Sequence, residues 1–134
     1  MRRGYARPKG SKYLNKKVVV DGIEFSSKKE ARHYQDLLLL SQSGEISDLR
    51  LQVPYELIPA QREPETIGPK GGVKPGKTLE RAVYYVADFV YVDKEGRTIV
   101  EDVKGYRGHT GAYSVFVLKR KLMLWKYGIS VKEV

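Results

Sequence analysis

The chain has 134 residues, a hydrophobic fraction of 41% and no cysteine, which fits one globular domain and excludes disulfides, thiolate zinc sites and cysteine nucleophiles. No apolar run reaches the ~20 residues that span a bilayer, and the first residues lead into no hydrophobic segment, so we expect an intracellular protein that is not secreted and binds no membrane. The formal net charge of +9 favours a polyanionic partner.

The first part of the chain, residues 1–15, is basic and has no hydrophobic periodicity, so we interpret it as an N-terminal arm ahead of a single domain at 16–134. Tyr5 and Tyr13 lie among its cations, a mixture that suits contact with sugars or bases. A solubilising tail is the alternative interpretation. Its candidate nucleic-acid contacts are Arg2, Arg3, Arg7, Lys9 and Lys12.

The next elements are a hairpin and a helix. Two short apolar segments around Asp21-Gly22 predict a tight β-hairpin over 17–25. Ser27 and Glu30 have capping-box spacing, so a helix is expected from about 28 to 43, ending at Gly44. The predicted buried stripe of this helix consists of Ala31, Tyr34, Leu37 and Leu38, widened by Leu39 and Leu40.

Residues 51–58 predict a strand, and Pro54 places it at an edge or a bulge. A long loop rich in glycine and proline is expected at 59–81, where such a length indicates a functional or disordered segment. Its candidate nucleic-acid contacts are Lys74 and Lys77.

Residues 82–92 and 97–104 predict an antiparallel strand pair around a turn at 93–96, followed by a glycine-punctuated loop that carries Arg107. A second helix is expected at 113–127, and a short strand at 129–134. The spacing of apolar residues in the helix predicts that four of them are core residues: Val115, Leu118, Leu122 and Trp125. The element order predicts a mixed α/β domain, in which two helices flank a small mixed sheet.

The two predicted strands carry the candidate chemistry. Because side chains alternate along a strand, Asp102 and Lys104 share one face, and Glu101 points to the other. Alternation places Asp88 with Val86, Val90 and Val92, and places Ala87, Phe89 and Tyr91 on the opposite face. A carboxylate at Asp88, among apolar neighbours, is costly unless it is paired or bound to a metal.

Two carboxylates and a lysine suit phosphodiester hydrolysis. Carboxylates bind hard cations such as Mg²⁺, which polarise the phosphate and lower the pKa of a bound water. A neighbouring ammonium can orient that water or stabilise the developing charge.

Asp88, a hairpin turn and then Asp102-Val103-Lys104 resemble the PD-(D/E)XK nuclease superfamily, over about residues 23–134. Ala87 stands where the superfamily name implies a proline. The resemblance implies a restriction-endonuclease-like core, with Asp88 and Asp102 as metal ligands and Lys104 acting on the attacking water. It also implies that Glu30 is the additional helical carboxylate, supporting a second metal or orienting Lys104.

More narrowly, the chain resembles short phage-encoded Holliday-junction resolvases and other structure-specific endonucleases. That resemblance implies a Mg²⁺-dependent DNA endonuclease, with Mn²⁺ able to substitute, acting on branched DNA in recombination as a homodimer. A phage-encoded protein would work in the cytoplasm of a bacterial host.

Each candidate residue also has an ordinary structural interpretation. Glu30 fits a helix cap, and Asp102 with Lys104 fits a same-face ion pair. His33 and His109 fit solvated positions as well as contacts with the site. Lys119 and Arg120 lie on a helix face that is either solvated or lines the cleft, and Lys119 is our candidate nucleic-acid contact there.

Two rival functions remain at the level of sequence. The first is a nucleic-acid-binding protein that keeps a nuclease fold without catalysis, and the second is a basic structural protein of a virion. RNA is a possible substrate in place of DNA.

Overall fold

The computed structural model describes residues 17–105 and 111–134. It opens with the predicted hairpin, β1 (Val18–Val20) and β2 (Ile23–Phe25). Asp21 and Gly22 form its turn with φ values of 52° and 76°, the left-handed pair that a two-residue hairpin turn requires.

Helix α1 (Lys28–Gln42) follows, with Ser27 as its N-cap and Gly44 beyond its end at φ 83°, as predicted. Ala31, Tyr34 and Leu37 are buried. The prediction that Leu39 and Leu40 widen the buried stripe is wrong, since Leu39 is 65% exposed and Leu40 is 41% exposed. Four successive leucines extend round a helix, and only one side of α1 meets the rest of the protein.

The main sheet has four strands in the order β10-β9-β8-β3. β8 is antiparallel to both neighbours and β10 is parallel to β9, so the predicted mixed α/β fold is confirmed. β3 lies at an edge, as Pro54 indicated. The strands are β3 (Ser47–Ile58), β8 (Val83–Val92), β9 (Thr98–Asp102) and β10 (Lys132–Glu133).

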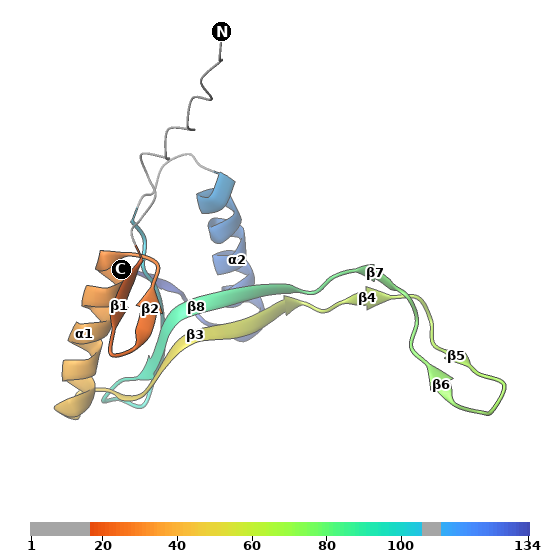
Figure 1. The fold of residues 1–134 in the computed structure, drawn as a ribbon, viewed down its shortest axis with the longest axis horizontal. Helices are drawn as coiled ribbons and strands as arrows, with labels where there is room; N and C mark the ends of the chain where they lie inside the picture. Colours follow the sequence, from red (N-terminus) through yellow and green to blue (C-terminus); the bar gives the residue numbers. More distant parts are fainter. Residues whose placement is uncertain (1–16, 106–110) are drawn as a thin grey trace, which may run out of the picture.

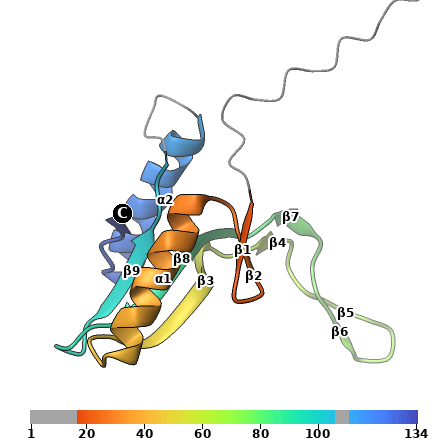
Figure 2. The ribbon, with the colours of Figure 1, turned by 60° about the vertical axis from the view of Figure 1, so that its left-hand side comes forward.

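Two hydrophobic cores hold these layers together. One lies under α1 and the first hairpin and includes Phe25, Leu37 and Phe89. The other lies under α2 (Gly111–Tyr127) and includes Val100 and Met123. The two helices therefore serve separate cores, with the sheet between them (Figures 1 and 2). Neither helix in the described part of the chain is long and apolar enough to cross a membrane.

The predicted buried face of α2 is wrong except at Leu122, which is partly buried against the core under α2. Phe116 and Met123 are its buried residues, whereas Val115, Leu118 and Trp125 are 52%, 59% and 80% exposed. The helix is apolar on more than one side, so periodicity alone did not identify the side that faces the sheet.

The segment 59–81, predicted as a loop, is a paired ribbon. We call it the arm, and from here on this name means residues 59–81 and not the basic residues 1–15. Its short strands pair as β4 with β7 and as β5 with β6. It extends the long β3–β8 hairpin away from both helices (Figure 1). Prolines and glycines break the pairing into two short ladders without ending it. The strands are β4 (Gln61–Arg62), β5 (Thr66–Ile67), β6 (Val73–Lys74) and β7 (Thr78–Glu80).

The prediction that side chains alternate strictly between the two faces along β8 is also wrong. Ala87 belongs to the core under α2, while Phe89, two residues on, belongs to the core under α1. On β3, Leu51 packs with the α1 core and Val53 with the α2 core. Both strands therefore change faces at the same level of the sheet. On β3 the change coincides with Gln52, which has a left-handed φ of 51° in place of an extended one.

Candidate active site

The site lies where β8 and β9 separate. Their ladder ends at the pair Phe89–Glu101. Beyond it the main chain of Lys104 turns to the opposite neighbour, donating to the Val134 carbonyl at 3.0 Å. The Val103 N–H donates instead to Oδ2 of Asp88 at 2.8 Å. Asp88 thus closes the fork between the two strands with its carboxylate.

Asp102 and Lys104 point the same way from this fork, as predicted. Lys104 Nζ lies 2.6 Å from Asp102 Oδ2 and 3.6 Å from the centre of the Phe116 ring. Asp102 is only 6% exposed. The ion pair itself fits the ordinary structural interpretation as well as a catalytic one, so the surroundings of Asp102 decide between them.

Those surroundings disfavour a charge on Asp102. Burial raises the pKa of Asp102 to about 6, and the Asp88 carboxylate raises it further against the lowering effect of Lys104. Asp102 Oδ2 is fully shielded, and it accepts no well-directed hydrogen bond within the described ranges despite the nearby ammonium. A buried oxygen without such a partner is unusual in a native fold. Lys104 therefore does not fully offset the burial of Asp102 and its repulsion by Asp88.

Glu30 joins the site from α1. The side-chain nitrogen of Gln52 donates both to Oε1 of Glu30 and to Oδ1 of Asp88, at 3.2 Å each. Ser26 donates to the second oxygen of Glu30 at 2.5 Å. Burial raises the pKa of Glu30, and the charge of Asp88 adds to this effect.

Glu30 also belongs to the helix cap, because its N–H donates to the Ser27 hydroxyl at 3.1 Å. The two interpretations of Glu30 therefore coexist in one residue: the main chain serves the cap, and the carboxylate faces Gln52.

Gln52 is the site residue that sequence analysis missed. Its partner pairs, Leu51–Phe89 and Val53–Ala87, place it opposite Asp88 across the β3–β8 ladder. A left-handed φ is rare for a residue with a side chain, and such conformations gather at functional sites. The only signal in the sequence was a polar residue between Leu51 and Val53.

The carboxylates fit a cation that keeps part of its water shell. Within 17–105 and 111–134, no three acidic or histidine side chains converge as a ready-made metal cage. Mg²⁺ is commonly held by one or two carboxylates together with waters and substrate phosphates. Asp88 and Asp102 supply such a pair. Glu30 is separated from them by the Gln52 amide.

An open hollow of about 260 Å³ lies beside this pair and is lined by Asp102, Lys104, Phe116 and Lys119, among others. Lys119 therefore borders the site, as one interpretation predicted, whereas Arg120 pairs with Glu133 at 3.4 Å. Burial, followed by the charge of Asp102, raises the pKa of the Tyr85 phenol, which keeps this lining residue neutral. The hollow therefore leaves the side of Asp102 and Lys104 open to a small ligand.

Residues 10–132 match a family described as "Protein of unknown function (DUF1064)". The chain belongs to this family. No curated protein and no solved structure matches the chain significantly. The range shared with the DUF1064 family contains every residue of the site described above, from Glu30 to Lys104.

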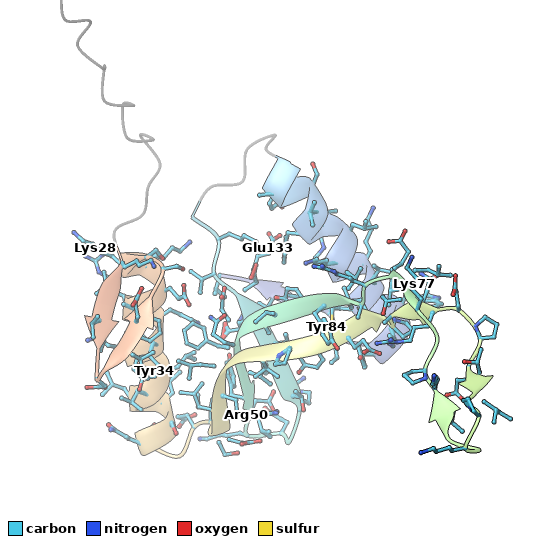
Figure 3. All side chains as sticks on the ribbon, turned by 45° about the vertical axis from the view of Figure 1, so that its right-hand side comes forward. Lys28, Tyr34, Arg50, Lys77, Tyr84 and Glu133 are labelled. Atoms are coloured by element: carbon cyan, nitrogen blue, oxygen red, sulfur yellow. The ribbon has the colours of Figure 1, made fainter. Side chains whose placement is uncertain are left out.

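The remaining predicted residues of this DUF1064 chain lie elsewhere. His33 pairs with buried Glu101 at 3.2 Å on the opposite face from Asp102, so it does not join the carboxylates. Lys74 and Lys77 lie on the arm, where Figure 3 labels Lys77. The other predicted contacts fall outside the described residues: Arg2, Arg3, Arg7, Lys9, Lys12, Arg107 and His109.

Proposed function

We propose that this protein is a Mg²⁺-dependent DNA endonuclease of the PD-(D/E)XK type. The observation that carries the proposal is the fork between β8 and β9, where half-buried Asp88 lies close to buried Asp102, whose raised pKa shows that Lys104 does not fully offset its charge. A purely structural ion pair has no need of the second carboxylate. A divalent cation supplies the missing charge, polarises the phosphate and lowers the pKa of its water.

The residues of the chain divide the remaining work. Asp88 and Asp102 would hold the cation. Lys104, which lies beside Asp102, would act on the attacking water or on the phosphate. Gln52 fixes the Asp88 carboxylate from the other side, and Glu30 orients Gln52. Glu30 reaches a second cation only if the Gln52 amide moves aside.

Cationic side chains hold the DNA backbone around this centre. Lys119 borders the hollow, and Lys74 and Lys77 extend along the arm. The basic N-terminal segment and Arg107 add to this set in the proposal. Neutralising about six phosphates gives a log–log dependence of affinity on salt with a slope near −5. We propose branched DNA, cut by a homodimer inside the cell, as in the phage resolvases that the sequence resembles.

The test is cleavage of a labelled four-way DNA junction beside a linear duplex of the same sequence, with Mg²⁺ and with chelator. Wild type should nick the junction in pairs, and Asp102→Asn and Lys104→Gln should each lower the rate by at least 100-fold. Asp48→Asn is the matched control, because Asp48 is exposed and its φ of 51° suits asparagine.

Equal cutting of both substrates would keep the nuclease and discard the preference for junctions. Tight binding without cleavage in Mg²⁺ or Mn²⁺ would instead favour the rival, a nucleic-acid-binding protein with the shape of a nuclease.

A further inference from the structure

The arm, residues 59–81, is built to meet something outside its own chain. Every residue of its four strands is exposed. Ile67 and Val73, which pair across β5 and β6, are 79% and 64% exposed. The arm projects from the long hairpin and covers no part of either core (Figures 1 and 2). It therefore adds nothing to the burial that stabilises the domain.

The sequence nevertheless specifies the shape of the arm. A side chain at Gly76 would place its Cβ 1.7 Å from the Glu63 carbonyl oxygen, so only glycine fits there. Glu63 N–H donates to the Lys77 carbonyl at 2.9 Å, and Arg62 donates to the Gly76 carbonyl at 3.3 Å. These contacts join the two ladders of the arm at the point where it changes direction (Figure 1). A ribbon held in one shape by a close approach differs from a plain linker.

The outer half of the arm is cationic and uncompensated. Residues 66–77 contain Lys70, Lys74 and Lys77 and no acidic residue. None of the three lysines forms an ion pair with the part of the chain that the structure describes. The acidic residues of the arm lie nearer its base, at Glu63, Glu65 and Glu80. This distribution suits a polyanion at the tip and not along the base.

The width and reach of the arm fit duplex DNA. The major groove of B-form DNA is about 12 Å wide and admits a two-stranded β-ribbon. β8 leads from the arm directly to Asp88. The roughly 16 residues between Gly72 and Asp88 span up to about 50 Å at a rise near 3.3 Å each, and the change of direction shortens this reach towards one helical turn of about 34 Å.

We infer that the arm docks in the major groove of duplex DNA, about one helical turn from the phosphate that a cation at Asp88 and Asp102 would hold. The position of that phosphate rests on the proposed function, whereas groove binding by the arm does not. Duplex flanking the cleavage site is thus part of the substrate, and the tip lysines contact its backbone while the exposed Ile67–Val73 pair faces the groove.

The test compares Gly76→Ala with Gly72→Ala. At Gly72 a Cβ would meet no atom within 4 Å, so this variant is a matched control. Affinity is measured by fluorescence anisotropy on duplexes whose flank is shortened from about 20 to about 5 base pairs. Wild type and Gly72→Ala should lose about tenfold in affinity once the flank falls below about 10 base pairs, the length of one turn. Gly76→Ala should bind all lengths equally weakly.

A second variant, Lys70→Ala with Lys74→Ala, keeps the glycine backbone and removes two cations. Its log–log salt slope should be less steep by about 2, since each phosphate contact contributes about 0.9. On duplex RNA, Gly76→Ala should not change the dependence of affinity on flank length, because the major groove of A-form RNA is too narrow for side chains to read.

Unchanged dependence on flank length in Gly76→Ala, together with an unchanged salt slope in the lysine variant, would overturn the inference. Dissociation of a dimer by the arm variants, with DNA affinity per protomer unaltered, would also overturn it and assign the arm to a second copy. Because these assays measure binding, absence of cleavage would reject the proposed nuclease while leaving arm docking to be decided by the flank series.

Discussion

Replacing Asp102 with asparagine should stabilise the protein at neutral pH while abolishing the proposed cleavage of DNA. The pKa of Asp102 rises from its ordinary value of 3.8 to about 6, chiefly because the group is buried. Each unit of such a rise corresponds to about 1.4 kcal/mol, so the ionised carboxylate costs the folded state about 3 kcal/mol above pH 6. Asparagine occupies nearly the same space and carries no charge.

The sign of the pH dependence follows from the two proton affinities. Below about pH 4 the carboxyl group is protonated in both the folded and the unfolded state, so it has no net effect on stability. Between about pH 4 and pH 6 the folded state keeps a proton that the unfolded chain has released. The free energy of unfolding therefore falls as the pH rises through this window, and the full cost remains above it.

The assay is urea unfolding of wild type and Asp102→Asn, at pH 4 and at pH 7.5, without divalent cations. Asp102→Asn should be more stable than wild type by about 2–3 kcal/mol at pH 7.5, and the gain should vanish near pH 4. Asp48→Asn should show no such dependence. If Asp102→Asn were destabilised at pH 7.5, the reasoning would fail, and Asp102 would be one half of a stabilising ion pair with Lys104.

Three further outcomes follow from the same structure. Mg²⁺ at ten times its Kd should raise the free energy of unfolding of wild type by about 1.4 kcal/mol and that of Asp102→Asn by nothing measurable, which thermal unfolding with and without Mg²⁺ checks. Gln52→Gly should relieve the left-handed φ and leave the fold intact, yet lower the cleavage rate 10- to 100-fold because Asp88 and Glu30 lose their common donor; an unchanged rate would remove Gln52 from the site. Met123→Ala should cost about 2–4 kcal/mol in urea unfolding, while Trp125→Ser should change stability by less than about 0.5 kcal/mol, and the reverse order would mean that α2 faces the sheet with its other side.

Local sequence signals were sufficient for several elements. The Asp21-Gly22 turn, the Ser27 cap and Gly44 each act on neighbours a few residues away, and all three lie as predicted. The shared face of Asp102 and Lys104 also depends only on two successive steps along one strand. The mixed sheet between two helices then follows from the order of these elements.

Features that depend on long-range pairing could not be predicted in this way. Gln52 contacts Asp88 across 36 positions of sequence, and the arm lies between them, so the register of β3 on β8 could not be counted from a turn. Both strands change faces at Gln52 and Asp88, so the prediction of strictly alternating side chains was also wrong. The prediction for α2 was wrong for a different reason. Its apolar residues surround the helix, and only its packing on the sheet decides that Phe116 and Met123 are the buried ones.

The residues at the fork between β8 and β9 cost the folded state free energy, and this cost argues for catalysis over binding alone. A protein that only holds nucleic acid needs cationic side chains near the phosphates. Carboxylates at the same place repel the phosphates. Asp102 nevertheless lines a hollow that Lys119 borders, and the charge of Asp88 acts on Asp102. The ionised pair opposes folding, and the left-handed Gln52 adds roughly 1–2 kcal/mol of backbone strain. Hydrophobic residues at these positions would be at least as stable. In the proposed nuclease a divalent cation would remove the repulsion and the charge penalty together, so the residues that weaken the empty fold would bind the substrate phosphate through the metal.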